Sequence, residues 1–350
     1  MTTLPAAPPG RLDDVVLMRH GAGGRAMRAL IHRIFARGMV PSTDTMIGLD
    51  AFDDGAAFRI GDEWLVITTD SHVIKPVEFP GGDIGRLSVS GTVNDLAMMG
   101  ATEPLGITCA VVIEEGFPVD VLTRIHDSML AAAREAGVPI VTGDTKVMGR
   151  GEVDGIILNT TGIGLTSHLV RDRGLQAGDR ILVSGSIGDH GMAIMAARHK
   201  LELGGDLASD VAPLNHLVRA ALEAGGDGVV AMKDPTRGGV ASALHEMAEK
   251  ARVGIVLEES SLPIRAQVAA AADLIGIDPL VVANEGKAVM GVRPEVADAV
   301  LAALRAHPLG RDAAIIGTAI ADYPGNVILD TGFGRRLVAE PEGELLPRIC

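Results

Sequence analysis

Strand-like and helix-like segments alternate along this 350-residue chain without the even spacing of repeated strand–helix–strand units. Near the start, the turn Gly61-Asp62 separates two strand-like segments, 56–60 and 64–69, which is the signal of a β-hairpin. A helical pattern at 86–99 and a strand-like run at 105–113 follow. Because hairpins and helices mix irregularly, the pattern predicts an α+β fold rather than a doubly wound parallel sheet.

A polar, glycine-containing stretch at 165–179 divides the chain into two halves of similar size. The length suffices for two domains, each with its own core. We therefore expect a first domain over 15–170 and a second over 171–335. The proline- and alanine-rich start, 1–14, is expected to be a disordered extension.

The chain ends in a segment, 336–350, that carries Pro341, Gly343 and Pro347 and terminates in Cys350. These prolines and the glycine disfavour a helix, and fifteen extended residues reach roughly 50 Å. The segment is therefore expected to be a mobile tail that can carry a thiol across a domain. A frayed chain end whose cysteine is incidental is the alternative.

Composition excludes several classes of function. A formal net charge of −14 argues against a nucleic-acid partner, and aromatic residues, at 2%, leave little surface for base stacking. The two cysteines, Cys109 and Cys350, lack the spacing of a disulfide framework, and no secretory or membrane-spanning segment is recognisable. The sequence therefore predicts a cytoplasmic protein without a membrane partner, in which Cys109 is a buried, inert strand residue.

Acidic residues occur at four places in the first half, at the ends of strand-like segments or on a helix. They are Asp53 with Asp54, Asp70, Asp95 with its neighbour Asn94, and Asp144. Each alone is readily explained as a turn or helix-cap residue. Because Mg²⁺ prefers oxygen ligands and shares them with substrate phosphates, the four together predict a metal–nucleotide site.

A glycine-rich loop precedes the first helical pattern, with His20, Gly21, Gly23 and Gly24 in sequence. Exposed backbone N–H groups in front of a helix can hold a phosphate. The loop lacks the spacing of a P-loop, so a flexible turn is the alternative.

Two motifs of the second half carry further candidates. Arg237, in Asp-Pro-Thr-Arg-Gly-Gly, opens a helix where it can bind an anion, or else lies solvated beside a capped turn. Glu285 interrupts an apolar stretch, so it is a general-base candidate with a raised pKa. A salt bridge to Lys287 or an exposed turn is the alternative for Glu285.

Five motifs, taken in order, resemble the ATP-binding superfamily that includes aminoimidazole ribonucleotide synthetase and selenophosphate synthetase. They are Asp-Asp-Gly-Ala-Ala, Thr-Asp-Ser-His-Val, Asn-Asp-Leu-Ala-Met-Met-Gly-Ala, Gly-Asp-Thr-Lys and Asp-Pro-Thr-Arg-Gly-Gly. Within it, the chain is similar to the HypE family of nickel–iron hydrogenase maturation proteins. That similarity lies in Met18-Arg-His-Gly-Ala-Gly-Gly24, Phe79-Pro-Gly-Gly-Asp-Ile-Gly85, Val141-Thr-Gly-Asp-Thr-Lys-Val147 and Pro347-Arg-Ile-Cys350.

The resemblance implies a two-domain aminoimidazole ribonucleotide synthetase-like fold, whose first domain binds ATP and forms a homodimer. It implies an ATP-dependent carbamoyl dehydratase. A carbamoyl group from the carbamoyltransferase HypF is accepted on the terminal cysteine and dehydrated to a thiocyanate. The cyanide then passes to iron on the HypC–HypD complex.

The same resemblance assigns roles to residues. Cys350 becomes the carrier, and Lys146, Arg237 and Glu285 lie near the carbamoyl group. The Mg-ATP site comprises Asp53, Asp54, Asp70, Asn94, Asp95 and Asp144, with the His20–Gly24 loop near the phosphates and Asp54, Asp95 and Asp144 as metal ligands. Two rival hypotheses remain: a kinase or synthetase of the superfamily that acts on a free small molecule, and a non-catalytic scaffold that only presents its cysteine.

Overall fold

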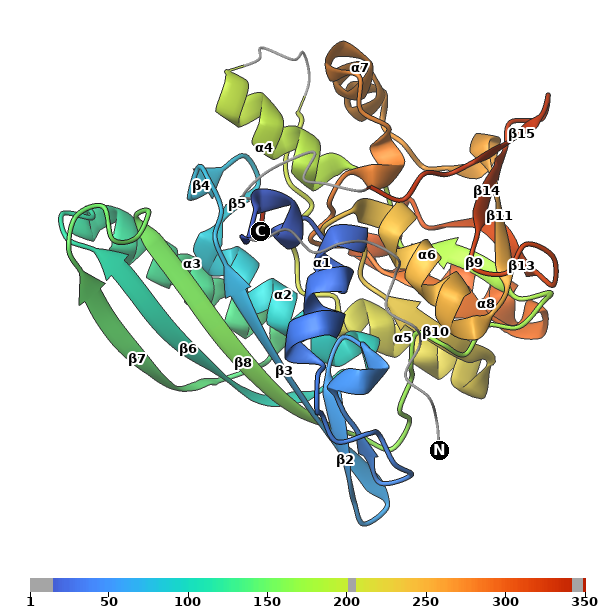
Figure 1. Cartoon of the computed structure of the whole chain (residues 1–350), viewed down its shortest axis with the longest axis horizontal. Helices are drawn as coiled ribbons and strands as arrows, with labels where there is room; N and C mark the ends of the chain where they lie inside the picture. Colours follow the sequence, from blue (N-terminus) through green and yellow to red (C-terminus); the bar gives the residue numbers. More distant parts are fainter. Residues whose placement is uncertain (1–14, 201–205, 342–348) are drawn as a thin grey trace.

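Two β-sheets, one in each half of the chain, organise the computed structural model (Figure 1). The structure describes residues 15–200, 206–341 and 349–350. The extension predicted at 1–14 and residues 342–348 of the predicted tail lie outside the described residues. The predicted α+β class is confirmed, because each sheet is flanked by helices without regular strand–helix–strand units.

The first sheet has six strands in the order β1-β2-β3-β8-β6-β7. They are β1 (Met46–Ile47), β2 (Ala56–Ile60), β3 (Glu63–His72), β6 (Pro104–Glu114), β7 (Ile140–Met148) and β8 (Ile156–Thr166). Neighbours run antiparallel except β6 and β7, which are parallel. The predicted hairpin is confirmed, since β2 and β3 pair up to Ile60 and Glu63 on either side of Gly61-Asp62.

Two helices, α2 (Ile84–Met98) and α3 (Val119–Ala136), cover one face of this sheet (Figure 1). The Asp83 carboxylate accepts a hydrogen bond from Arg86 N (2.9 Å) and caps α2. Gly137 adopts the left-handed conformation (φ 70°) that ends α3. Helix α2 is buried along almost its whole length because it lies between the sheet, α3 and the second half of the chain.

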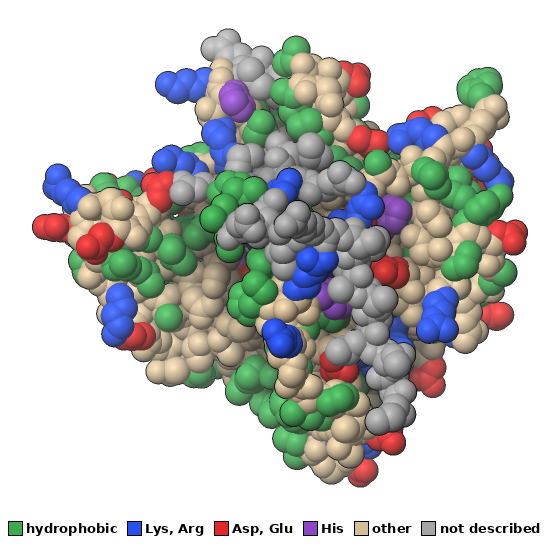
Figure 2. All heavy atoms as spheres, viewed as in Figure 1, with side chains coloured by type: hydrophobic (Ala, Val, Ile, Leu, Met, Phe, Trp, Pro, Cys, Tyr) green, Lys and Arg blue, Asp and Glu red, His purple; other side chains and the backbone are tan. Residues whose placement is uncertain are grey.

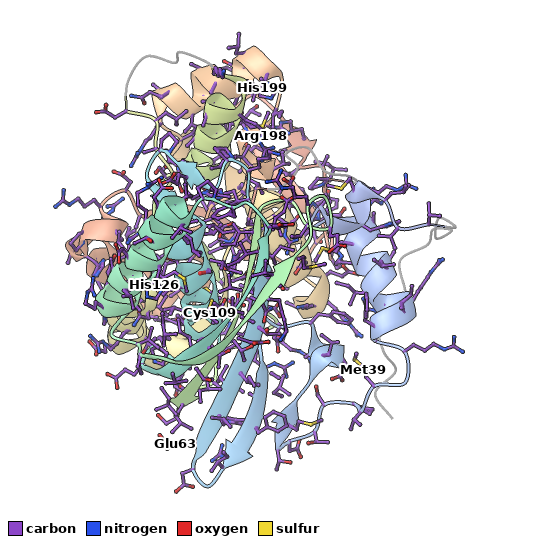
Figure 3. All side chains as sticks on the ribbon, turned by 90° about the vertical axis from the view of Figure 1, so that its left-hand side faces the viewer. Met39, Glu63, Cys109, His126, Arg198 and His199 are labelled. Atoms are coloured by element: carbon purple, nitrogen blue, oxygen red, sulfur yellow. The ribbon has the colours of Figure 1, made fainter. Side chains whose placement is uncertain are left out.

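The other face of the first sheet is open. Strand β8 shows the alternation: Leu158 and Thr160 are buried towards α2, whereas Ile163 points away and is 36% exposed. Phe58 on β2 and Leu105 on β6 are also exposed. Figure 2 shows hydrophobic side chains on the surface of the lobe that β6, β7 and β8 form. Cys109 is buried, as predicted, and Figure 3 places it among the elements of this domain.

The second sheet has seven strands in the order β10-β12-β9-β13-β11-β14-β15. They are β9 (Arg180–Val183), β10 (Val229–Lys233), β11 (Gly254–Glu258), β12 (Val289–Val292), β13 (Ala314–Ile320), β14 (Val327–Asp330) and β15 (Arg335–Leu337). Strand β15 and the buried Val338 continue this sheet beyond residue 335, where the second domain was expected to end. A two-stranded pair, β4 (Glu78–Phe79) and β5 (Gly82–Asp83), lies apart from both sheets.

Helices cover both faces of the second sheet. Leu182 packs with residues of α5 and α8, whereas its neighbours Ile181 and Val183 pack with α6 on the opposite face. The helices are α4 (Asp189–His199), α5 (Asn215–Gly225), α6 (Gly239–Ala251), α7 (Ala266–Ile275) and α8 (Pro294–Ala306). Near the start, α1 (Arg25–Leu30) continues into a π-helical turn, Ile31–Phe35, and short 3-10 turns occur at Met18–Gly21, Leu49–Ala51, Gly226–Gly228, Glu259–Ser261, Pro279–Val281 and Pro308–Gly310.

The two halves share hydrophobic cores. Ala97 and Met98, at the end of α2, pack with residues of α5 and α8, and Met192 of α4 packs in the core that contains Ile84. Figure 3 shows the extent of the molecule, with Glu63 at the tip of the β2–β3 hairpin and His199 at the far end of α4. Over the described ranges of the chain, no helix is both long and apolar enough to cross a membrane.

Candidate active site

A cavity of about 620 Å³ lies where the two halves meet. Its lining comes from the β1–β2 region, β3, α2, β8, the segment after β10, the segment before β12 and the chain end. The lining residues are Gly48, Leu49, Asp53–Ala56, Ile67–Asp70, Gly91, Asp95, Thr161, Lys233, Asp234, Thr236, Arg237, Glu285 and Cys350. Gly91 of α2 gives the site room, because a Cβ there would lie 2.9 Å from His72 and 3.4 Å from Asp70.

Acidic groups crowd one another in this cavity. Burial, together with Asp234, Asp70 and Asp54, raises the pKa of Asp95 well above its ordinary value. Burial and Asp54 raise the pKa of Asp234 to about 8. Thr68 Oγ1 donates to Asp95 Oδ2 (2.7 Å) and only partly offsets these effects. The cluster is therefore short of positive charge, which a bound cation would supply.

Asp53 and Asp54 each form an ion pair with a cation of the second half. Arg171 Nε lies 2.6 Å from Asp53 Oδ2, and Lys233 pairs with Asp54. Burial and the neighbouring Asp172 raise the pKa of Asp53 to about 7, whereas burial raises that of Asp54 against the opposing effect of Lys233. These pairs join the first domain to the second at the floor of the cavity.

Glu285 is buried at 3% exposure and lines the cavity. Burial, Asp234 and Asp70 raise its pKa well above the ordinary value, as the sequence predicted. The alternative of a salt bridge with Lys287 is not observed, since Lys287 Nζ pairs with Asp210 at 3.0 Å. Glu285 Oε1 is buried without a hydrogen-bond partner, so it is available to a bound substrate.

Cys350 docks in the cavity of its own chain. Its main-chain carboxyl oxygen accepts a hydrogen bond from Val73 N (3.2 Å), and the preceding Ile349 is only 4% exposed. Burial raises the pKa of the Cys350 thiol, an effect that Glu285 reinforces and Arg237 opposes. The thiol is therefore held neutral beside the candidate base and the candidate anion-binding arginine.

The glycine-rich loop adjoins the cavity through Arg237. Arg237 Nη1 donates to Gly21 O (3.2 Å), and a Cβ on Gly23, which has φ of +79°, would lie 2.6 Å from Arg237 Cβ. His20 is buried in this loop. The loop residues are not among those that line the cavity, so the loop lies behind Arg237 rather than in the lining itself.

Besides the four loop residues, three predicted site residues lie outside the cavity lining of the single chain. Asp144 and Lys146 pair with each other at 3.0 Å on β7, where their side chains are 61% and 68% exposed. Asn94 is buried, with its amide bonded to Ala212 O, Glu285 O and Leu214 N, so it joins the two halves and does not line the cavity. The remaining predicted acids, together with Arg237, Glu285 and Cys350, line the same cavity.

Sequence reasoning missed Lys233, Asp234 and Asp172. Asp234 is the first residue of the motif that contains Arg237, so its position in that motif could have identified it as a site residue. Lys233 ends an apolar strand, where a lone cation signals a buried partner. Asp172 follows the first domain directly, and nothing in its local sequence indicates its pairing with Lys250.

Comparison with known proteins agrees with this geometry. Family models of the AIR synthase related protein match this chain, the N-terminal domain over residues 52–166 and the C-terminal domain over 176–330. The carbamoyl dehydratase HypE of Rhizobium leguminosarum bv. viciae is 50% identical over 344 residues, 97% of this chain and 95% of that protein.

Solved structures show the same similarity. The crystal structure of a HypE–HypF complex contains a chain with a TM-score of 0.82 and 44% identity, covering 89% of this chain and 100% of that one. The structure of a HypE in complex with ATP has a TM-score of 0.78 and 39% identity, covering 96% of this chain and 100% of that one.

Proposed function

Because this chain belongs to the HypE family of carbamoyl dehydratases, we propose that its cavity is where a carbamoyl group on Cys350 meets ATP. The chain is an ATP-dependent carbamoyl dehydratase of hydrogenase maturation, which turns an S-carbamoyl group into a protein thiocyanate. The observation that carries the proposal is the position of the thiol, since Cys350 lines the same cavity as Asp54, Asp95 and Glu285.

The chemistry requires activation of an amide oxygen. In the first step the carbamoyl oxygen attacks the γ-phosphorus of ATP and ADP leaves, which converts that oxygen into a leaving group. In the second step the two protons leave the carbamoyl nitrogen as the C–O bond breaks, so phosphate departs and the group becomes S–C≡N. Such a transfer depends mainly on positioning and charge neutralisation.

Glu285 is our candidate for the base of the second step. Its unpartnered Oε1 is buried in the cavity that holds Cys350. Burial keeps this carboxyl neutral to a higher pH than usual, and Arg237 acts in the opposite direction. Arg237 is therefore assigned two tasks: it orients the carbamoyl oxygen, and it favours the ionised form of Glu285.

The acid cluster fits Mg²⁺ bound together with ATP. Asp54, Asp70, Asp95 and Asp234 repel one another, and a divalent cation would relieve the repulsion that raises the pKa of Asp95 and Asp234. Among the described residues no three His, Cys, Asp or Glu side chains are gathered as a ready-made metal site. Mg²⁺ commonly takes one or two carboxylates plus phosphate oxygens, and when bound it would neutralise phosphate charge. We assign Asp54 and Asp95 as its protein ligands and Asp53 and Asp70 to the nucleotide, whereas the His20–Gly24 loop contacts Arg237 behind the lining.

We further propose that the chain is a homodimer through the open face of its first sheet. Exposed Phe58, Leu105 and Ile163 support this, because apolar sheet faces are normally covered. Asp144 and Lys146 lie on β7 of the same sheet, so a second chain that covers it would bring them near an active site. We also propose HypF as the carbamoyl donor and the HypC–HypD complex as the cyanide acceptor.

Intact-mass analysis after incubation with a carbamoyl donor, HypF and ATP tests the function. We expect a thiocyanate on the C-terminal peptide of the wild type and none on C350S, whereas C109S should still form it. A free-substrate enzyme would turn over normally in C350S, and a scaffold would show no ATP turnover. An unmodified Cys350 in the presence of active HypF would refute the proposal.

A further inference from the structure

The last two residues of the chain are bound through their main-chain oxygens and through the side chain of Ile349. Val73 N donates to a main-chain carboxyl oxygen of Cys350 (3.2 Å), and His190 Nε2 lies 2.6 Å from the Ile349 carbonyl oxygen. The Ile349 side chain is 4% exposed and packs in the core that includes Phe79, Met192 and Val211. Two backbone oxygens and one apolar side chain are thus recognised, and Cys350 itself lines the cavity.

The hydrogen-bond network fixes the tautomer of His190. A carbonyl oxygen only accepts, so Nε2 must carry the proton and Nδ1 must accept from Ser209 Oγ (2.7 Å). Ser209 Oγ is free to donate because it accepts from Val211 N (3.1 Å). Burial lowers the pKa of His190, so the ring is neutral as this network requires. The docked state therefore requires the tautomer of His190 in which Nε2 donates to Ile349 O.

The two donors come from different domains, and further contacts connect the segments that carry them. Val73 follows β3 of the first domain, and His190 lies in the first turn of α4 in the second. Arg198, at the far end of α4 in Figure 3, donates to Lys75 O (2.8 Å), which ties this helix to the segment after Val73. The Phe79 ring packs edge-on against His190 with centroids 5.6 Å apart. Both domains therefore supply contacts that fix the positions of Val73 and His190.

We propose that His190, Val73 N–H and the apolar pocket of Ile349 form a binding site for a peptide that ends in Ile-Cys, whatever group the sulfur carries. His190 is a positioning residue, since it acts through the tail and not on the reacting atoms. The purpose of the site rests on the proposed function: free thiol, thiocarbamate and thiocyanate would all be presented at the same place. Backbone recognition suits a carrier whose sulfur changes at each step.

Alkylation of the full-length protein by iodoacetamide, followed by mass analysis, tests the site without ATP or HypF. Docking leaves Cys350 only partly exposed at the cavity, so its alkylation should be slower than that of a tail that has left the site. We expect Cys350 to react about tenfold faster in H190A, because the Ile349 carbonyl loses its buried donor. H190Q retains an N–H donor and should restore much of the protection. H126A changes an exposed histidine of α3 and should react like the wild type, and buried Cys109 serves as the internal reference.

Competition in the wild-type protein keeps the proposal testable if H190A does not fold. A synthetic peptide Pro-Arg-Ile-Cys with a methylated sulfur should displace the tail and accelerate Cys350 alkylation at millimolar concentration, since a tethered tail has an effective concentration of that order. The same peptide with alanine in place of isoleucine should be weaker. An unchanged Cys350 rate in folded H190A, or equal potency of the two peptides, would overturn the site. Because neither assay involves dehydration, failure here leaves the proposed function standing, and absence of thiocyanate leaves this site standing.

Discussion

Replacement of Lys233 by methionine would remove the cation on which the buried acids of the cavity depend. Lys233 pairs with Asp54, and its Nζ lies 3.4 Å from Glu246 and 3.8 Å from Asp172. Burial alone would lower the pKa of Lys233, but these three carboxylates raise it well above its ordinary value, so the side chain is charged. Methionine keeps most of the length and loses the charge. Removal of one partner of a buried ion pair costs about 3–5 kcal/mol.

The matched control is Lys146→Met on β7. Lys146 also pairs with an aspartate, Asp144, at 3.0 Å, but both side chains are more than half exposed. An exposed pair contributes about 0–1 kcal/mol. An unfolding entropy of about 2.1 cal/mol/K per residue gives about 0.7 kcal/mol/K for 350 residues, if they unfold together. The Tm should therefore fall by about 4–7 °C in K233M and by about 1 °C or less in K146M.

The loss in K233M should also depend on pH. Without the ammonium group, Asp54 can regain neutrality only by binding a proton, which is easier at low pH. Calorimetry near pH 5.5 and pH 8 should therefore show a larger difference between K233M and wild type at pH 8. A K233M protein that melts within 1 °C of wild type at pH 8, or that resembles K146M at both pH values, would refute the buried-pair reasoning.

Three further predictions concern the cavity and the sheet. The pKa values of Asp53 (about 7) and Asp234 (about 8) lie above their ordinary values, so the folded state holds protons that the unfolded state releases. The nucleotide-free protein should therefore lose stability as pH rises from about 5 to 8, by up to about 1.4 kcal/mol per pH unit per group. Mg-ATP should raise the Tm more at pH 8 than at pH 5. A Tm that does not change with pH would contradict this prediction. Glu285→Gln should slow thiocyanate formation about 10²–10⁴-fold while ATP still raises the Tm; near-normal turnover would exclude Glu285 as the base. Ile163→Lys should shift the protein from dimer to monomer in light scattering, and an unchanged mass would place the interface elsewhere.

Local sequence patterns predicted most of the secondary structure but not its limits. The helix expected at 86–99 is α2 (Ile84–Met98), because its helical residue pattern is a local signal. Asp144, expected at the end of a strand-like segment, lies inside β7, which continues to Met148. Glycine and aspartate at 143 and 144 are typical of a turn, but parallel pairing with β6 overrides that preference. Asp144 is therefore inside an exposed strand instead of at a strand end beside the cavity.

Adjacent residues can also serve different surfaces. Asn94 and Asp95 lie side by side in the sequence, and successive helix residues point about 100° apart. Asp95 consequently lines the cavity, whereas Asn94 bonds to the backbone of the second half. The family resemblance assigns both residues to the Mg-ATP site, but helix geometry places only Asp95 in the cavity.

The sequence by itself determined the fold class, the family and the chemical inventory of the site, because hairpin signals, helical periodicity and short motifs are local properties of the chain. Only the tertiary structure decided which groups meet. Lys233 and Asp54, 179 positions apart, pair across the two domains, and His190 binds Ile349 from 159 positions away. Local sequence records no partner for a buried charge or for a chain end. Those partners are selected when the two sheets dock, since burial makes an unpaired charge or carbonyl costly.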